Sequence, residues 1–534
     1  MKENFARSGT LFLQYLKRDW KKIIFWITGL GLFSAVFVPA FEEIAKGQGL
    51  TGMYETMQNP AMTAMVGPTP VDSAAEYTVG AMYTHEMLLF CGVVAMIISA
   101  LHVVSHTRKE EDLGLTELVR SFQVGRQANS LAVLLEVTLI NIILAAVISV
   151  IMMSFNADGF SVSGTVIFGT SIGAAGLIGA VIALAASQLM PSSSGASGLT
   201  LGIIGLMYII RAGTDTVNTD LSMLNPMGWT YLTFPFTENN VMPLIYTAAF
   251  LIIVSVIAFT LEGYRDMGAG YLPERAGHPQ ASRMLLSVPG WFFRINRSVI
   301  ISWMIGFIAI GAAYGSIYGD MQSFIESNAM IQQMFTTTGV SIEVSFTGTI
   351  MAVVISLVSI LPIVIVNKLY NEETRQHLSQ IYATRVSRGK LFFTALGLAV
   401  TVGFIGTLIS ALGLGLTALG SMDNTSVISL SDFINSGLNF FPVVLFFTGI
   451  SSLLLGWLPK FGKLVYIVLV YSFFLDYFQG ILDLPEWVEK TAVQSFLPRV
   501  PLDSFEWGPF LIITGISIFL MLLGYIGYKR RDLA

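Results

Sequence analysis

An acidic pair, Glu110 and Glu111, lies in the charged segment RKEEDLGLTELVRSFQVGR, which runs from 108 to 126. Carboxylates and guanidinium groups at this spacing form ion pairs and charge-assisted hydrogen bonds, within a chain or with a protein that binds it. The segment is unusual because only 12% of the residues of the chain are charged. These residue types therefore favour non-covalent recognition over catalysis.

No catalytic motif stands out in the rest of the sequence. A G-x-x-x-x-G-K-[ST] phosphate loop is absent, because the run from Gly456 to Lys463 has the wrong spacing. The single cysteine, Cys91, excludes an intramolecular disulfide and a cysteine-based metal cluster. His102 and His106 lack acidic or cysteine companions at ligand spacing along the sequence. We therefore expect no metal site and no catalytic residue.

The chain is far more apolar than a soluble protein. Of its 534 residues, 54% are hydrophobic, and the mean hydropathy is +0.70. Because a soluble domain carries about 25% charged residues, we predict an all-α polytopic membrane protein. The net charge of -5 and the scattered basic residues imply no nucleic-acid partner.

Twelve apolar runs are long enough to cross a bilayer as helices, for which about 20 residues are needed. None of them alternates as the strands of a membrane barrel do. The run at 464–481 has the weakest pattern, because it contains Asp476. The runs lie at 23–41, 86–105, 130–154, 164–190, 195–212, 242–262, 298–318, 347–366, 390–417, 433–456, 464–481 and 509–528.

Two acidic residues within these runs are candidate intramembrane polar sites, since charge inside a membrane is costly and is often functional. Glu136 lies about two turns inside the third run, within reach of Arg126, which favours a structural ion pair. Asp476 lies near the outer end of its run, beside Tyr477 and Gln479, where it can reach water.

The positions of Lys and Arg predict the orientation, because these residues are retained on the cytoplasmic side. With both termini in the cytoplasm, that side holds 25 of the 29, all except Lys46, Arg211, Lys490 and Arg499. The amino-terminal residues lack the pattern of a cleaved signal peptide, and residues 8–22 predict an amphipathic arm on the inner leaflet. We expect a multi-pass protein of the plasma (cell inner) membrane whose charged segment faces the cytoplasm.

The two halves of the chain repeat one another. The segment 110–126 corresponds to 372–388 at a constant offset of 262 residues, with an acidic pair and a terminal Arg in both. Each half holds six runs, an even number, so the halves have the same orientation. We predict two fused parallel six-helix repeats, at 1–268 and 291–534, joined by a linker at 269–290.

Both charged loops read as short amphipathic helices, at 108–126 and 370–388. A solvated connector that only satisfies the positive-inside rule stays an alternative, although a connector needs no acidic pair. The apolar stripes are Leu115, Leu118, Val119 and Phe122 in the first loop, and Leu378, Ile381 and Tyr382 in the second.

The pattern E-E-x-x-G-x-x-E-L followed by V-x-R resembles the cytoplasmic coupling loop of permease subunits of type 2 ATP-binding-cassette exporters, particularly the two-half polyketide-antibiotic and drug exporter type. The resemblance spans nearly the whole chain, including the R-D-M-G-A-G stretch after the sixth run. The second loop departs from it at Gln376 and Ser379. The resemblance carries an ATPase-coupling role to Glu110, Glu111, Gly114, Glu117, Arg120, Arg126, Glu372, Glu373, Arg375 and Arg388.

The resemblance implies a transport subunit that is not an enzyme and holds no cofactor. Two copies of a soluble ATP-binding-cassette ATPase subunit would bind the ATP and Mg, and would drive alternating access. The other expected partners are membrane lipid and a small-molecule cargo, which is a hydrophobic or amphipathic antibiotic, drug or lipid-like compound that leaves the cell. The alternatives are an ion-coupled secondary transporter of the major-facilitator type, which also has two parallel six-helix halves, and a membrane enzyme.

Aromatic residues precede the last run of each half. They fit an aromatic belt at the membrane interface, whereas the resemblance favours half-inserted segments that gate the exit. The candidate gate residues are Trp229, Phe234, Phe236, Phe496 and Trp507.

The charge distribution generates a prediction about topology. In a Cys91→Ser background, single cysteines at Asp158, Asp320 or Asp423 are expected to react with an impermeant thiol reagent in intact cells, because these loops face outward. A cysteine at Gly114 is expected to react only after the cells are opened. Equal labelling of Gly114→Cys and Asp320→Cys in intact cells would contradict the orientation.

Overall fold

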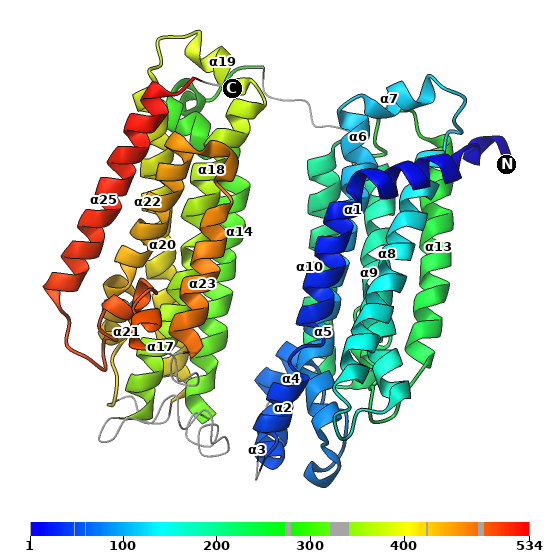
Figure 1. Ribbon diagram of the computed structural model, residues 1–534, viewed down its shortest axis with the longest axis horizontal. Helices are drawn as coiled ribbons and strands as arrows, with labels where there is room; N and C mark the ends of the chain where they lie inside the picture. Colours follow the sequence, from blue (N-terminus) through cyan, green and yellow to red (C-terminus); the bar gives the residue numbers. More distant parts are fainter. Residues whose placement is uncertain are drawn as a thin grey trace. The chain divides into compact units, whose positions relative to one another are not determined.

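The chain folds as a polytopic all-α membrane protein. The computed structural model describes residues 2–46, 49–58, 60–272, 279–320, 341–422, 426–478 and 485–532, and these ranges contain helices and no strand. The chain divides into two compact units, Met1–Ala276 and Gly277–Ala534. Figure 1 shows long helices lying side by side within each unit.

Within the described ranges, 11 helical segments are long and apolar enough to cross a membrane. Twelve were expected from the sequence. Of the run predicted for 464–481, the structure describes 464–478, which form the apolar helix α23 (Leu464–Phe478); the rest of this run lies outside the described residues.

Unit 1 is built around α9, which packs against α5, α8, α10 and α13, while α1 packs against α8. Its short helices are α2 (Val38–Ile44), α3 (Gly49–Met57), α4 (Pro60–Val66), α6 (Arg108–Asp112), α7 (Leu115–Arg120), α11 (Thr219–Ser222) and α12 (Gly228–Tyr231). The long helices are α1 (Ser8–Phe33), α5 (Val79–His106), α8 (Ala128–Ser154), α9 (Val162–Leu189), α10 (Ser193–Asp215) and α13 (Met242–Tyr264).

Helix α9 takes the central place because its surface is made of small residues, which let helix backbones approach closely in a membrane. A Cβ atom built on Gly173 would lie 2.8 Å from the carbonyl oxygen of Asn141 on α8. One built on Gly179 would lie 2.2 Å from the carbonyl oxygen of Met96 on α5. Only glycine therefore fits at positions 173 and 179 without moving α8 or α5.

Unit 2 repeats this packing: α14 lies against α20 as α1 lies against α8, and α25 lies against α22 as α13 lies against α9. Two of its spanning segments are broken, at Ser359 and at Phe440. The long elements are α14 (Val288–Ser316), α17 (Ile342–Val358), α18 (Ile360–Thr374), α20 (Arg388–Ser421), α21 (Leu430–Asn439), α22 (Phe441–Trp457), α23 and α25 (Trp507–Arg530), with the short helices α19 (His377–Tyr382) and α24 (Glu486–Glu489).

The amino-terminal arm predicted at 8–22 is continuous with the first spanning helix, α1. In Figure 1 the beginning of α1 lies across the same end of unit 1 as α6 and α7. Leu13 and Trp20 are exposed, whereas Tyr15 and Asp19 are buried. The arm thus presents apolar groups outward, as an interfacial helix does, and anchors itself with polar ones.

The close contact of α9 with α5 generates a prediction. Gly179→Ala should destabilise the purified protein by about 1–3 kcal/mol, the usual cost of overpacking, because its Cβ would collide with a backbone oxygen. Gly198→Ala on α10 meets nothing within 4 Å and should be neutral or slightly stabilising. Thermal unfolding in detergent measures both changes, and equal midpoints for the two variants would contradict the packing.

Candidate functional site in the two charged loops

The first charged loop is two short helices joined by a left-handed turn. Helix α5 ends at His106, α6 spans Arg108–Asp112, and Gly114 has φ 72° before α7 begins. Glycine suits this conformation because it has no Cβ. The turn aims α7 away from α6, so the two helices present different faces to the rest of unit 1.

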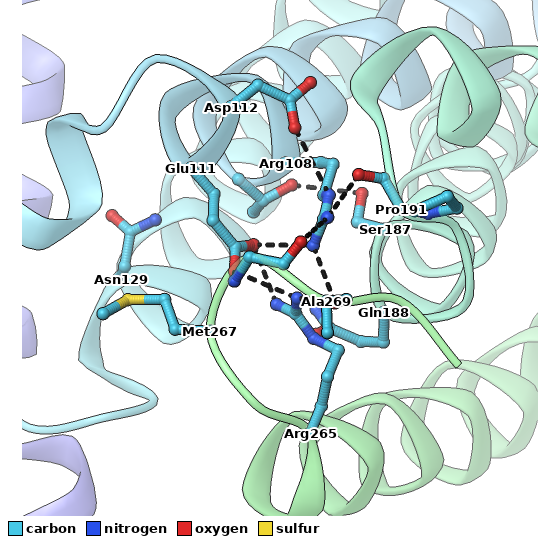
Figure 2. A network of polar contacts seen from close by, with 12 residues as sticks. Arg108, Glu111, Asp112, Asn129, Ser187, Gln188, Pro191, Arg265, Met267 and Ala269 are labelled. Atoms are coloured by element: carbon cyan, nitrogen blue, oxygen red, sulfur yellow. Dashed lines mark hydrogen bonds and ion pairs between the residues drawn. The ribbon is translucent and has the colours of Figure 1, made fainter. Parts of the chain in front are cut away.

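Glu111 holds α6 to the residues that follow α13. Its two carboxylate oxygens accept hydrogen bonds from both terminal nitrogens of Arg265, at 3.0 and 2.8 Å, and from the backbone N–H of Gly268 at 2.6 Å. Arg108 adds a third cationic contact at 3.1 Å. Figure 2 shows these groups converging on the Glu111 side chain, which is only 9% exposed.

Arg108 joins α6 to two further loops. Its side chain is 1% exposed and donates to the carbonyl oxygens of Gly268 at 2.7 Å and Ala269 at 3.1 Å, and to that of Pro191 in the loop between α9 and α10. Asp112 accepts a hydrogen bond from the backbone N–H of Ser193 at 2.7 Å. These contacts fix α6 to the ends of α9, α10 and α13 (Figure 2).

The same device recurs in unit 2. Arg531 donates to Glu373 at 2.6 Å, as Arg265 donates to Glu111. Arg265 and Arg531 are the C-cap residues, which directly follow α13 and α25. A second arginine, at the end of each charged loop, donates to the backbone carbonyl oxygen of this C-cap residue. In unit 1, Arg126 donates to Arg265, and in unit 2, Arg388 donates to Arg531 at 2.6 Å. The sequence repeat therefore encodes one ion-pair network twice.

The first carboxylate of each acidic pair has different partners in the two units. Glu110 pairs with Arg18 of α1 at 2.8 Å and accepts a hydrogen bond from Tyr15 at 3.2 Å. Glu372 contacts Lys368 at 3.0 Å and His377 at 2.6 Å. All four acidic side chains are thus engaged within the chain. Their predicted role in coupling to an ATPase stays a prediction.

The apolar stripe of the first loop is exposed. Leu115 is 44%, Leu118 63% and Phe122 69% exposed, and Leu113 beside them is 64% exposed. In the second loop, Leu378 is buried, and Ile381 and Tyr382 pack against the core of unit 2. The loops therefore share their ion pairs and differ in the surface that they offer to a partner.

The remaining predicted coupling residues complete the loops. Glu117 and Arg375 are exposed, and Arg120 donates to the carbonyl oxygen of Arg126 at 2.7 Å. Burial lowers the pKa of the Arg120 guanidinium, yet arginine stays protonated at neutral pH. Gln376 takes the place of Gly114 with φ 62°, so the second loop keeps the left-handed turn at the cost of backbone strain.

Burial also raises the pKa of Tyr382. Its hydroxyl therefore stays neutral and pairs with that of Tyr528 at 2.8 Å. This contact fastens α19 to α25, so the second loop is tied to the last helix by a neutral pair as well as by the Glu373 ion pair.

Glu136 pairs with His102 of α5 at 3.2 Å, and the ion pair with Arg126 predicted from the sequence is wrong. His106 Nε2 lies 2.9 Å from the Asp19 carboxylate. The histidines do have acidic companions, which come from α1 and α8. Ligand atoms of His102, His106 and Glu136 lie within 4.8 Å of one another, a spacing compatible with a metal, although the existing pairs already join three helices.

Asp476 does not reach water as expected from the sequence. Its side chain is 6% exposed, and one oxygen lies 3.6 Å from the Arg499 guanidinium. This ion pair connects α23 with the segment that precedes α25. The arginine was counted among the outer-side charges, and its position shows why a carboxylate is tolerated near the end of an apolar helix.

The aromatic residues proposed as an exit gate fall into two groups. In unit 1, the Trp229 indole N–H donates to the carbonyl oxygen of Met223 at 2.7 Å, and the Phe236 ring lies 4.8 Å from that of Phe160. In unit 2, Phe496 is 52% and Trp507 66% exposed. Phe234 and Phe236 both have positive φ. The gating role stays a prediction.

Sequence reasoning missed Glu86 and the buried pair Arg211–Asp215, whose side chains are 3.0 Å apart. Glu86 was taken as the first residue of the run 86–105, whereas α5 begins at Val79. Arg211 was counted only as an outer-side charge. The signal for both was present, because each is charged and stands within an apolar stretch.

The chain is similar to a known protein and to a family model. Residues 285–529 match the family model described as the C-terminal domain of multidrug efflux system permease Rv1217c. The chain is also 26% identical over 532 residues to the multidrug efflux system permease protein Rv1217c of Mycobacterium tuberculosis, covering 98% of this chain and 95% of that relative. The likeness extends over both units.

The ion-pair network generates a prediction about stability. Glu111→Gln should cost about 3–5 kcal/mol, because it leaves the buried Arg265 guanidinium without its counter-charge. Glu117→Gln removes an exposed carboxylate of the same loop and should cost less than about 1 kcal/mol. Unfolding midpoints in detergent compare them. Indistinguishable midpoints would show that the Glu111 contact contributes no net stability.

Proposed function

We propose that this chain is the transmembrane permease subunit of an ATP-driven exporter that moves hydrophobic or amphipathic drugs out of the cell. Its similarity to a multidrug efflux permease over nearly its full length, and its 11 candidate spanning helices, support a drug-exporting permease. The ATP-hydrolysing partner is inferred from the geometry of the first charged loop.

Exposed apolar residues on and beside α7 carry this inference. Leu113, Leu115, Leu118 and Phe122 are each at least 44% exposed and are clustered within ten residues. Single exposed apolar residues are ordinary on a protein surface, whereas a contiguous patch marks an interaction site. The orientation predicted from the charges puts this patch in the cytoplasm, where a soluble ATPase can cover it.

The buried ion pairs couple this apolar patch mechanically to the long helices of unit 1. A displacement of α7 would be transmitted to α6 and, through the Glu111–Arg265 ion pair, to the end of α13. It would also reach the loop between α9 and α10 through the hydrogen bonds of Arg108 and Asp112. Packed elements respond to such a displacement by rigid-body movement. Closure of two ATPase copies, which hold the ATP and Mg, would then move the helices of each unit and alternate access to the cargo.

We expect both loops to dock, but unequally. The first offers apolar area, whereas the second offers the polar side chains His377, Ser379 and Gln380 and keeps its stripe inside unit 2. Burial of apolar surface is the main source of binding free energy at interfaces. The first loop should therefore contribute most of the free energy of docking. We also propose that both termini lie on the cytoplasmic side of the cell membrane, as the loops do.

One observation favours an ion-coupled transporter as second candidate. The described part of unit 1 contains buried acidic groups paired with histidines, Asp19 with His106 and Glu136 with His102. Such pairs can carry protons in transporters. Efflux from vesicles that stops without ATP and continues with a protonophore would exclude this candidate, and the reverse result would replace the ATP-driven one.

Charge placed on the apolar face tests the proposal. Leu118→Glu combined with Phe122→Glu should abolish co-purification of the ATPase and drug efflux, because each carboxylate would have to be desolvated in the interface. Both side chains are exposed, so the variant should insert and fold normally. Ser379→Glu combined with Gln380→Glu in the second loop is the matched control and should have a weaker effect. Native mass of the wild-type complex should show two ATPase copies.

Normal efflux by the Leu118→Glu, Phe122→Glu variant would refute docking through α7. A stable wild-type complex with a single ATPase copy would refute the use of both loops.

A further inference from the structure

A groove in unit 1 is formed by α4, α5 and α10. Its volume is about 700 Å³, within the range of sites that hold drug-sized molecules, about 300–1,000 Å³. The lining is almost wholly apolar, with Leu89, Phe90 and Val93 from α5 and Ile204 and Ile209 from α10. A ligand here would be held mainly by apolar contact.

Glu86 is the one charged residue among those that line this groove. It lies seven residues after the first residue of α5, about 10 Å along the helix axis. Its Oε1 atom is buried and has no hydrogen-bond partner. No ion pair to Glu86 occurs within the described ranges of the chain, so the carboxylate has no counter-charge of its own.

The basic residue of α10, Arg211, does not line the groove and is paired elsewhere. Arg211 of α10 pairs with Asp215 at 3.0 Å and donates to the carbonyl oxygens of Ala64 at 2.6 Å and Met65 at 2.8 Å. Its side chain is fully buried in these contacts. Tyr208 donates its hydroxyl to Met65 at 2.8 Å, which fixes the ring as part of the wall.

Glu86 as a whole is half-buried, and its Oε1 atom shares the lack of a hydrogen-bond partner with Oε2 of Glu262 in the same unit. Several other carboxylates of unit 1 are paired. Asp19, Glu111, Glu136 and Asp215 each contact a basic side chain. A carboxylate without a partner in apolar surroundings is costly in its ionised form. A cation that entered the groove would remove this cost and would bury its apolar body at the same time.

We propose that this groove binds lipophilic cations, such as protonated amines or delocalised organic cations with an apolar body, and that Glu86 is their counter-ion. The exposed Phe90 ring adds an aromatic face that attracts a cation, whereas the Tyr208 ring already carries the Arg211 guanidinium at 4.3 Å. A neutral ligand would leave the carboxylate unpaired, and an anion would be repelled by it. The proposal names a cargo class and so rests on the proposed export function, but the binding site itself does not require an ATPase.

The test is equilibrium binding to the purified chain, without an ATPase, of two probes of matched size and opposite charge. Tetraphenylphosphonium should bind, and tetraphenylborate should bind at least about tenfold more weakly. Glu86→Gln keeps the shape of the side chain and removes its charge, so it should weaken phosphonium binding about tenfold or more. Glu86→Asp keeps the charge and should retain most of the affinity.

A second pair of variants addresses the groove without touching the charge. Gly205 lines the groove, and Gly202 lies one turn away on α10 outside the lining; a Cβ on either meets nothing within 4 Å. Gly205→Leu should block phosphonium binding by filling the groove, whereas Gly202→Leu should not. Equal phosphonium affinity in wild type, Glu86→Gln and Gly205→Leu, or equal binding of both probes to wild type, would overturn the assignment. Because binding is the readout, a failure of ATP-driven export would leave a positive result intact.

Discussion

A carboxylate and a guanidinium join the charged loop of each unit to the end of that unit's last long helix. The pairs are Glu111 with Arg265 and Glu373 with Arg531. Each of these two arginines is the C-cap residue of its helix. A second arginine, Arg126 or Arg388, donates to the backbone carbonyl oxygen of this C-cap residue. In unit 1 this link couples α6 directly to the end of α13, and the contacts of Arg108, Asp112 and Glu110 tie it to other helices. A force applied to α6 and α7 is therefore passed to the helices and does not only bend the loop.

This constraint explains why so little of the loop is available for a partner. The acidic pairs are turned inward, and what remains outside is an apolar face in unit 1 and a polar one in unit 2. The duplication therefore preserved the internal link and let the outer surfaces diverge. Under the proposed function, movement would pass through two similar links, while the two loops would bind the ATPase with unequal strength.

Much of the fold could be predicted from the sequence, because apolar runs and the repeat of an acidic pair are local patterns. The directions of the side chains could not. Glu111 and Arg265 are separated by 154 residues, so no periodicity within the loop reveals that the carboxylate faces inward. The pairing of His102 with Glu136 was hidden for the same reason, because its members lie on different helices.

The boundaries of the apolar runs were a further source of error. Glu86 was placed at the edge of a run, where a charge attracts no attention, whereas α5 continues for seven residues before it. The end of the run at 464–481 lies outside the described residues, and its Asp476 pairs with Arg499. At Glu86 and at Asp476, a charged residue inside an apolar stretch marked a feature that hydropathy alone does not show.

The most direct test of the central claim is site-specific photocrosslinking from the exposed apolar residues of the first charged loop. A photoreactive phenylalanine analogue at Phe122, in cells that also make the cognate ATPase, should give a crosslinked species with the mass of permease plus ATPase. The same analogue at Trp229, in the segment before α13, should give none. Absence of the ATPase crosslink from Phe122, with the complex intact, would contradict docking through the first charged loop.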